Sequence, residues 1–560
     1  MSGVVMTKVM DDGSPYHVIN YDDSSGLTDT VTNGDSINKT VYIYNGVKNS
    51  DFDSKYLQTL LELINTLESL FPKTPMDIEF AIDQKGILFL LQVRQITTIK
   101  KWNQSANDLV SKRIIHLEEY INSLMHPRNE LAGDKTLLGI MPDWNPAEMI
   151  GVVPSPLSKS LYRKLITRRA WREARVEMGY RNMPNVELMI SLFGRVYIDV
   201  RNSFNSFLPK GLSKELSNKL LNGFIKRLET NPHLHDKVEF EVVPTAFDFS
   251  FEEKFSKWYP NLLTQEELNN YREKLKQLTI EAIDYKVINN SLEKAEIKIN
   301  LLSEKQKVIN NEPNRNIFQL SDQINTLLSD CVNLGTIPFS IIARHGFIAE
   351  NMLRSLISNK VISKERIFSF KSSIKTVSTE MSREFHQVCS NDILKSTFLK
   401  KYGHLRPNSY DILSPTYRNR KNLFDGEPKA LNSHDKFSLT PGETLKITNL
   451  FDDNDINQFS PSDLFNYAEK AIIGREYAKF IFTRHLSIIL ELIAEWGETN
   501  NFSREEMSML SIDDILSILH SPLTEDVKTH YHKKVTTAKN EYDISLSFLS
   551  ASEQYQKFHF

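Results

Sequence analysis

The sequence has few cysteines, no excess of basic residues and no long apolar run at its start. Its two cysteines, Cys331 and Cys389, show no CxxC or other metal-ligand spacing. This argues against a disulfide framework or a zinc site and suits a reducing compartment. The formal net charge is −3 without a block of like charge, so the basic stripe typical of duplex-binding proteins is missing. This charge pattern argues against a nucleic-acid partner.

Signals for export or membrane insertion are weak as well. The first residues, MSGVVMTKVMDDG, lack the apolar core of a signal peptide. The apolar run YAKFIFTRHLSIILELIAEWG contains Arg484, His485 and Glu491, which makes it a poor membrane span. Apolar residues make up 40% of the 560 positions and charged residues 25%. We therefore expect a cytoplasmic globular protein of about three or four domains, with no membrane partner.

Hydrophobic spacing predicts an α+β start followed by a mostly helical body. Two short strands around an Asp-Asp-Gly turn, a third strand at KTVYIYNG and an amphipathic helix at SKYLQTLLELINTLESLF come first. The helical period then dominates, apart from two strand-like pieces, GRVYIDVR and KVEFEVV. Later helices are expected near 316–334, 336–358, 363–401, 441–452, 461–497, 503–520 and 524–549. The predicted segments are 1–98, 99–245 with the motif PDWNPAEMIG, 246–413, a polar linker at 414–437, and 438–560.

The most informative stretch is DIEFAIDQKGILFLLQVRQITT, residues 77–98. Alternation places Glu79 on one face of a first strand, while Gln92 and Arg94 share a face of the second strand across a DQKG turn. If the strands pair, the three side chains lie close together. A carboxylate and an amide oxygen suit Mg²⁺, and the planar fork of an adjacent Arg suits a phosphate. The alternative is a plain cross-strand salt bridge between Glu79 and Arg94.

This stretch resembles the closing segment of the ATP-grasp domain of phosphoenolpyruvate synthase, pyruvate phosphate dikinase and rifampin phosphotransferase. That family has the pattern D-I-E-(W/F)-x-(I/V), a turn, and L-(Y/F)-(I/L)-L-Q-x-R-P-I-T. SGVVMTKVMDDG also resembles its S-G-V-x-F-T hairpin. The resemblance implies Mg²⁺ and ATP as cofactors, with Glu79 and Gln92 as metal ligands and Arg94 on the phosphates. INYDDSSGLTDTVTNG resembles the family segment G-L-G-E-x-V-V-x-G, with Gly26-Leu27-Thr28-Asp29 in place of G-L-G-E. The resemblance thus implies Asp29 as a metal ligand, with a shorter reach than the Glu of the family.

Two parts of that family are not recognised in this sequence. The ATP-grasp domain of the family begins well before the S-G-V hairpin. Family members also transfer phosphate through a histidine in a Gly-Gly-x-(Thr/Ser)-Ser-His context, which none of the fourteen histidines here has. We therefore expect a fragment, a truncated product or one half of a split enzyme. In the last case a separate polypeptide would supply the missing ATP-grasp half or the phosphohistidine domain.

FLKKYGHLRPNSYDILSPTY, residues 398–417, resembles a motif in the helical substrate domain of rifampin-phosphotransferase-like proteins, Y-G-H-R-G-x-x-E-x-D-x-x-x-P-R-(W/Y). His404, Arg406 and Asp411 align with its polar members and are the candidate catalytic residues. A His oriented by an Asp would suit general-base work near neutral pH. Pro407 and Tyr410 replace the Gly and the Glu of the motif. The alternative is a polar network that terminates a helix.

The motif PDWNPAEMIG has two interpretations. Asn145 followed by Pro146 predicts a turn, with Pro146 at the first position of a helix and Glu148 near its positive end. This makes the motif a structural corner. In the functional alternative, Trp144 is a stacking surface at a substrate lip.

Three further sequence features complete the predictions. Arg475 and Glu476 are expected to make packing or interhelical contacts. His233 and His235 lie two apart without an acid cluster, which is weak evidence for a metal. The predicted function is an ATP-dependent phosphotransferase similar to phosphoenolpyruvate synthase and pyruvate phosphate dikinase, incomplete as a single chain, with an unknown small-molecule acceptor. The rival is a non-catalytic helical scaffold or partner subunit with a vestigial nucleotide hairpin.

Overall fold

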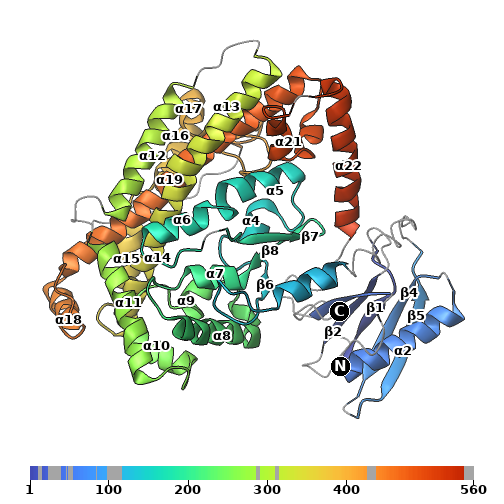
Figure 1. Cartoon of the computed structure of the whole chain (residues 1–560), viewed down its shortest axis with the longest axis horizontal. Coiled ribbons are helices and arrows are strands. Elements are labelled where there is room, and N and C mark those ends of the chain that lie inside the picture. The colour runs from blue at the N-terminus through green and yellow to red at the C-terminus, as the bar shows by residue number, and fades with distance from the viewer. Residues whose placement is uncertain are drawn as a thin grey trace.

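The computed structural model describes a small N-terminal sheet with one helix and a larger, mostly helical body (Figure 1). The predicted α+β class is therefore confirmed. The described residues are 1–10, 16–22, 39–45, 47, 54–72, 74–83, 85–97, 116–183, 185–284, 290–309, 315–425, 437–521 and 523–547.

The N-terminal sheet is antiparallel and has the strand order β3-β2-β1-β4-β5. Helix α2, Lys55–Leu70, begins at the side-chain cap of Ser54 and buries Leu60 and Ile64 against Ile78 and Phe80 of the sheet. Because strand side chains alternate, the opposite face of the sheet is left for polar groups. The strands are β1 Ser2–Met6, β2 Tyr16–Asp22, β3 Lys39–Tyr44, β4 Met76–Ile82 and β5 Leu88–Gln95.

The body begins with a small second sheet and continues as helices. The second sheet has the order β6-β8-β7, with β6 at Leu138–Gly139, β7 at Met189–Leu192 and β8 at Arg195–Asp199. The first helices are α4 Pro146–Ile150, α5 Pro156–Tyr162, α6 Ala170–Glu177, α7 Val200–Ser206, α8 Lys214–Thr230, α9 Val238–Glu241, α10 Phe251–Trp258 and α11 Gln265–Ile283.

The C-terminal half of the body is built around helix α19, Pro461–Thr499, which packs against α12, α13 and α14. A π-helical segment, Cys331–Thr336, joins α13 to α14. One buried cluster contains residues from 131 to 535, on both sides of the boundaries predicted at 245 and 413. The division of the body into segments stays a prediction. The remaining helices are α12 Ser291–Lys307, α13 Ile317–Asp330, α14 Ile337–Ser358, α15 Lys364–Ser373, α16 Val377–Cys389, α17 Lys395–Tyr402, α18 Pro441–Asp452, α20 Arg504–Ser508, α21 Ile512–Ser517 and α22 Val527–Ser547.

Three sequence-based expectations about elements were wrong. The helix expected at 503–520 is two helices, α20 and α21, because Ser511 caps a new helix start. KVEFEVV contains the short helix α9 rather than a strand, because Val238 and Val242 are both buried in the core and Glu239 pairs with Arg344 of α14. Apolar residues four positions apart, as Val238 and Val242 are, also lie on one face of a helical turn. The single helix expected at 363–401 is three helices, since Ser363 and Thr376 each cap a new helix start.

One helical run, 317–358, is long and apolar enough to cross a membrane by length and composition. In the most apolar 18-residue window of this run, 72% is buried inside the protein. A buried core helix passes the same test, so this run is weak evidence for a membrane span.

Candidate functional site

The β4–β5 hairpin is fixed by its turn and its register. The Asp83 carboxylate accepts hydrogen bonds from the backbone N–H groups of Lys85 (2.9 Å) and Ile87 (2.8 Å), and Gly86 supplies a positive φ of 82°. This is the predicted DQKG turn. Glu79 pairs in register with Gln92, and a register shift follows between Glu79 and Phe80. The polar pairs Asp77–Arg94 and Glu79–Gln92 lie before this β-bulge, so regular pairing places them on one face.

Glu79, Gln92 and Arg94 converge on that face as the alternation predicted. Arg94 Nη2 donates to Glu79 Oε1 at 2.7 Å and to Gln92 Oε1 at 2.6 Å. The Arg94 side chain is 56% exposed and that of Glu79 is 25% exposed. A single guanidinium therefore holds both candidate metal ligands at the protein surface. The roles of the three residues in binding stay predictions, and the cross-strand salt bridge is also present.

Asp77 is a further acid on this face to which the sequence analysis gave no role. It pairs in register with Arg94, and its Oδ1 is buried without a hydrogen-bond partner in the described part of the chain. Burial raises the pKa of Asp77, Arg94 lowers it, and Glu79 raises it further. Strand alternation already placed Asp77 beside Glu79, so this signal was available in the sequence.

The oxygen atoms on this face fit a hard cation. Asp77, Glu79 and Gln92 offer two carboxylates and one amide oxygen, the ligand types that Mg²⁺ prefers. Asn20 lies in the same row, across Val4 from Glu79, and its Oδ1 is also buried without a hydrogen-bond partner in the described ranges. Asp29 lies outside the described residues. Within them, no group of three or more His, Cys, Asp or Glu side chains could hold a metal, so a cation here would depend on amide oxygens as well.

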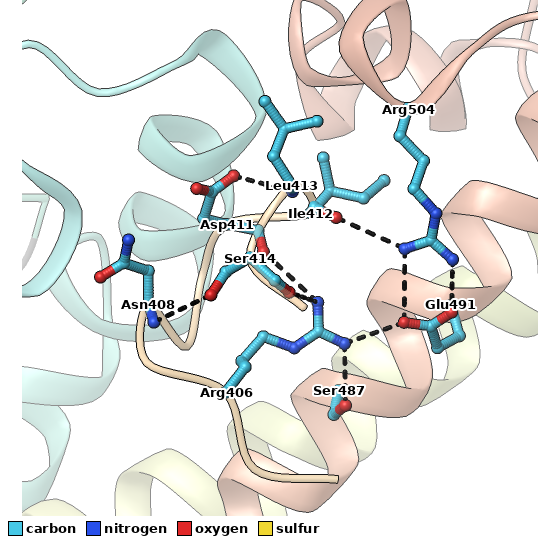
Figure 2. A network of polar contacts seen from close by, with 9 residues as sticks. All are labelled: Arg406, Asn408, Asp411, Ile412, Leu413, Ser414, Ser487, Glu491 and Arg504. Carbon is cyan, nitrogen blue, oxygen red and sulfur yellow. Dashed lines mark hydrogen bonds and ion pairs between the residues drawn. The ribbon is translucent and has the colours of Figure 1, made fainter. Parts of the chain in front are cut away.

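Arg406 is the centre of the second candidate site (Figure 2). It is buried, and its Nη2 donates to Ser487 Oγ at 3.0 Å and to Glu491 Oε1 at 2.9 Å on helix α19. Its Nη1 donates to the carbonyl oxygens of Asp411 (3.3 Å) and Ser414 (3.4 Å). The guanidinium therefore ties the loop after α17 to α19, and Glu491 in turn pairs with Arg504 at 2.6 Å.

His404 and Asp411 do not form the pair that the sequence suggested. The Asp411 carboxylate accepts from the backbone N–H of Leu413 at 2.9 Å, as Figure 2 shows. The His404 ring packs edge-on against Phe480 at 4.8 Å, and burial, with the nearby Arg484, lowers the pKa of His404 to about 3. In the described chain no hydrogen bond joins the two side chains. A ring with that pKa is a weak base, so the geometry supports the alternative of a polar network at a helix end, and a catalytic role stays untested.

The PDWNPAEMIG motif forms the predicted corner. The Asn145 side chain caps α4 by accepting from the backbone N–H of Glu148 at 3.2 Å, and Pro146 is the first helical residue. Asp143, Trp144 and Asn145 have positive φ values of 51°, 56° and 39°, a strained run for residues other than glycine. Trp144 packs against Phe339 at 5.9 Å, which uses part of its ring for packing.

A buried ion pair holds this corner in place. The Asp143 carboxylate accepts from Arg175 Nη2 at 2.7 Å and from Arg175 Nη1 at 2.9 Å, and Ser203 Oγ donates to it at 2.7 Å. Arg175 also stacks over the Phe207 ring, with 3.9 Å to the ring centroid. These contacts over-determine the strained backbone, which is how such conformations persist.

Arg475 and Glu476 make the expected packing and interhelical contacts. Ser378 Oγ of α16 donates to Glu476 Oε2 at 2.9 Å, and the Arg475 guanidinium lies 5.8 Å from the centroid of the Phe347 ring of α14. Both residues therefore connect α19 to its neighbours.

Residues 18–113 match a family described as pyruvate phosphate dikinase, AMP/ATP-binding domain. The matched range contains the β4–β5 hairpin with Glu79, Gln92 and Arg94. No curated protein matches the chain. The N-terminal part is thus similar to an ATP-binding domain of the phosphoenolpyruvate synthase and dikinase type, and the match does not extend to the helical body.

Proposed function

We propose that this chain binds Mg-ATP at the β4–β5 hairpin and takes part in an ATP-dependent phosphoryl transfer. The observation that carries the proposal is the convergence of Glu79 and Gln92 on Arg94. The match of residues 18–113 to an AMP/ATP-binding domain supports ATP as the ligand. Positioning and charge neutralisation account for most of the catalysis in such reactions, and this face offers groups for both.

In the proposed binding step, Arg94 occupies Glu79 and Gln92 through hydrogen bonds until the nucleotide binds. Its guanidinium is the exposed member of the cluster and carries the positive charge that pairs with Glu79. A triphosphate offers it several anionic oxygens, and Arg94 turns toward them and releases Glu79 and Gln92. Those two oxygen ligands, with Asp77 beside them, would hold Mg²⁺, which neutralises phosphate charge when bound. The acceptor of the phosphoryl group is a small molecule.

Isothermal titration of Mg-ATP into the whole chain tests the proposal. We expect saturable binding by the wild type and a loss of about tenfold or more in affinity for Glu79→Ala, because one charged ligand is removed. Glu62→Ala is the matched control, since Glu62 is exposed on α2 and has no part in the hairpin face. Equal binding by Glu79→Ala and the control, or no binding by any of the three proteins, contradicts the proposal.

The second candidate function is a non-catalytic scaffold. It is favoured by the Arg406 network, where each candidate catalytic group has a structural partner or packs against an aromatic ring. A chain that lacks Mg-ATP binding but keeps its fold in the same titration fits this function. The two candidates are therefore separated by one measurement.

A further inference from the structure

A cavity of about 420 Å³ lies in the helical body, where α12, α14 and α19 pack together. Ile299 and Ile342 form apolar parts of its wall, and Ile473 and Tyr477 continue the wall along α19. Binding pockets for small molecules have this size and this mostly apolar lining, and they are common between helices of a bundle. The cavity is separate from the β4–β5 hairpin and from the Arg406 network.

The polar groups of the cavity carry a net negative charge. Lys470 Nζ pairs with Glu296 Oε2 at 3.0 Å on the wall. Glu469 is a second lining carboxylate on the exposed side of the cavity, so two carboxylates stand against one ammonium group. Burial raises the pKa of Glu296, Lys470 lowers it, and Glu293 on the same helix raises it again. A further positive charge near Glu296 would therefore stabilise the charged form of this partly buried carboxylate.

Gly474 keeps the cavity open beside this carboxylate. A Cβ atom at position 474 would lie 3.1 Å from Ile342 Cγ2 and 3.6 Å from Glu296 Oε1. Contacts of this kind crowd the space between α14 and α19, so a larger side chain fills the part of the cavity that adjoins Glu296. The glycine therefore leaves room for a ligand group next to the acid.

We propose that this cavity binds a small organic cation, an ammonium group on a compact apolar body. The ammonium group donates to Glu296 and lies near Glu469, while the apolar body packs on Ile299, Ile342 and Ile473. The charge of the lining selects a cation over an anion of the same size. This site goes beyond the proposed nucleotide binding and does not depend on it.

Calorimetric titration of the whole chain with 2-phenylethylammonium tests the proposal. We expect saturable one-to-one binding, and no saturable binding of 3-phenylpropionate, which has a similar body and the opposite charge. Glu296→Gln should weaken amine binding by about tenfold or more, because it removes a charge-assisted hydrogen bond. Gly474→Val should weaken binding by filling the cavity.

Matched controls keep the test decisive. Glu304→Gln removes an exposed carboxylate from the same helix, where it pairs only with Lys307 in the described chain, and should bind the amine like the wild type. Thermal unfolding checks that each variant is folded, and Glu469→Gln replaces Glu296→Gln if the latter is not. Glu79→Ala should retain amine binding whatever its effect on Mg-ATP. Unchanged affinity in the folded cavity variants, equal binding of the anion, or no saturable binding of the amine overturns the proposal.

Discussion

At the scale of single residues, the burial of a charged pair decides how much its loss lowers the stability of the protein. The Arg175 and Asp143 side chains are 7% and 2% exposed, whereas those of Lys307 and Glu304 are 65% and 66% exposed. We expect Arg175→Met to lower the free energy of unfolding by about 3–5 kcal/mol, because Asp143 is left buried without its cation. Lys307→Met should change it by less than about 0.5 kcal/mol. Urea unfolding of both variants measures the difference, and equal effects would contradict this assignment.

Buried histidines give the protein a predictable loss of stability in acid. Burial lowers the pKa of His404 from 6.5 to about 3. The unfolded chain therefore takes up the proton first, so the contribution of His404 is complete above pH 6.5 and is lost as the pH falls toward 3. We expect His404→Gln to reduce the slope of unfolding free energy against pH in that window by up to about 1.4 kcal/mol per pH unit.

The control for this pH dependence is His116→Gln, since the His116 side chain is 81% exposed. Chemical unfolding at a series of pH values between 6.5 and 3 gives the slopes. The same slope in wild type and His404→Gln would show that the ring takes up its proton at the same pH in the folded and unfolded states, and this would restore His404 as a candidate base near neutral pH.

At the scale of elements, the edge strand β5 is unusual. Among the described strands it pairs only with β4, and Phe89, Leu90 and Leu91 are between 45% and 52% exposed. Apolar edge strands with free backbone groups favour pairing between molecules. We expect Leu91→Lys to reduce concentration-dependent association, measured by light scattering, more than Phe368→Lys does. Phe368 is 67% exposed but lies on helix α15, which has no free edge.

The β4–β5 hairpin also shows how far sequence reasoning extends. Alternation and the DQKG turn were enough to predict that Glu79, Gln92 and Arg94 lie together, because a hairpin is a local structure. The surroundings of His404 could not be predicted from the local sequence. Phe480, which packs against its ring, lies 76 positions further along the chain on helix α19. KVEFEVV was assigned to the wrong element for the same reason: the pairing of Glu239 with Arg344 depends on a distant helix.

At the scale of the whole molecule, the N-terminal sheet and the helical body have separate buried clusters. Ile64 belongs to the cluster between α2 and the sheet, and Ile489 belongs to the cluster of the body; both are 0% exposed. Chains with separate cores depart from two-state unfolding. We therefore expect two transitions in calorimetry, with Ile64→Ala lowering only the one that belongs to the sheet and Ile489→Ala only the other.

The expected size of each effect is about 2–5 kcal/mol, the cost of removing a buried isoleucine side chain down to alanine. Hydrogen exchange read by peptide mass assigns each transition, because Ile64→Ala should increase exchange in the strands and leave α14 and α19 protected. A single transition that both variants shift alike would mean that the two cores unfold together.

Mg-ATP at the hairpin stabilises only the folded sheet. Under the proposed function it should therefore raise the temperature of the sheet transition and leave that of the body unchanged.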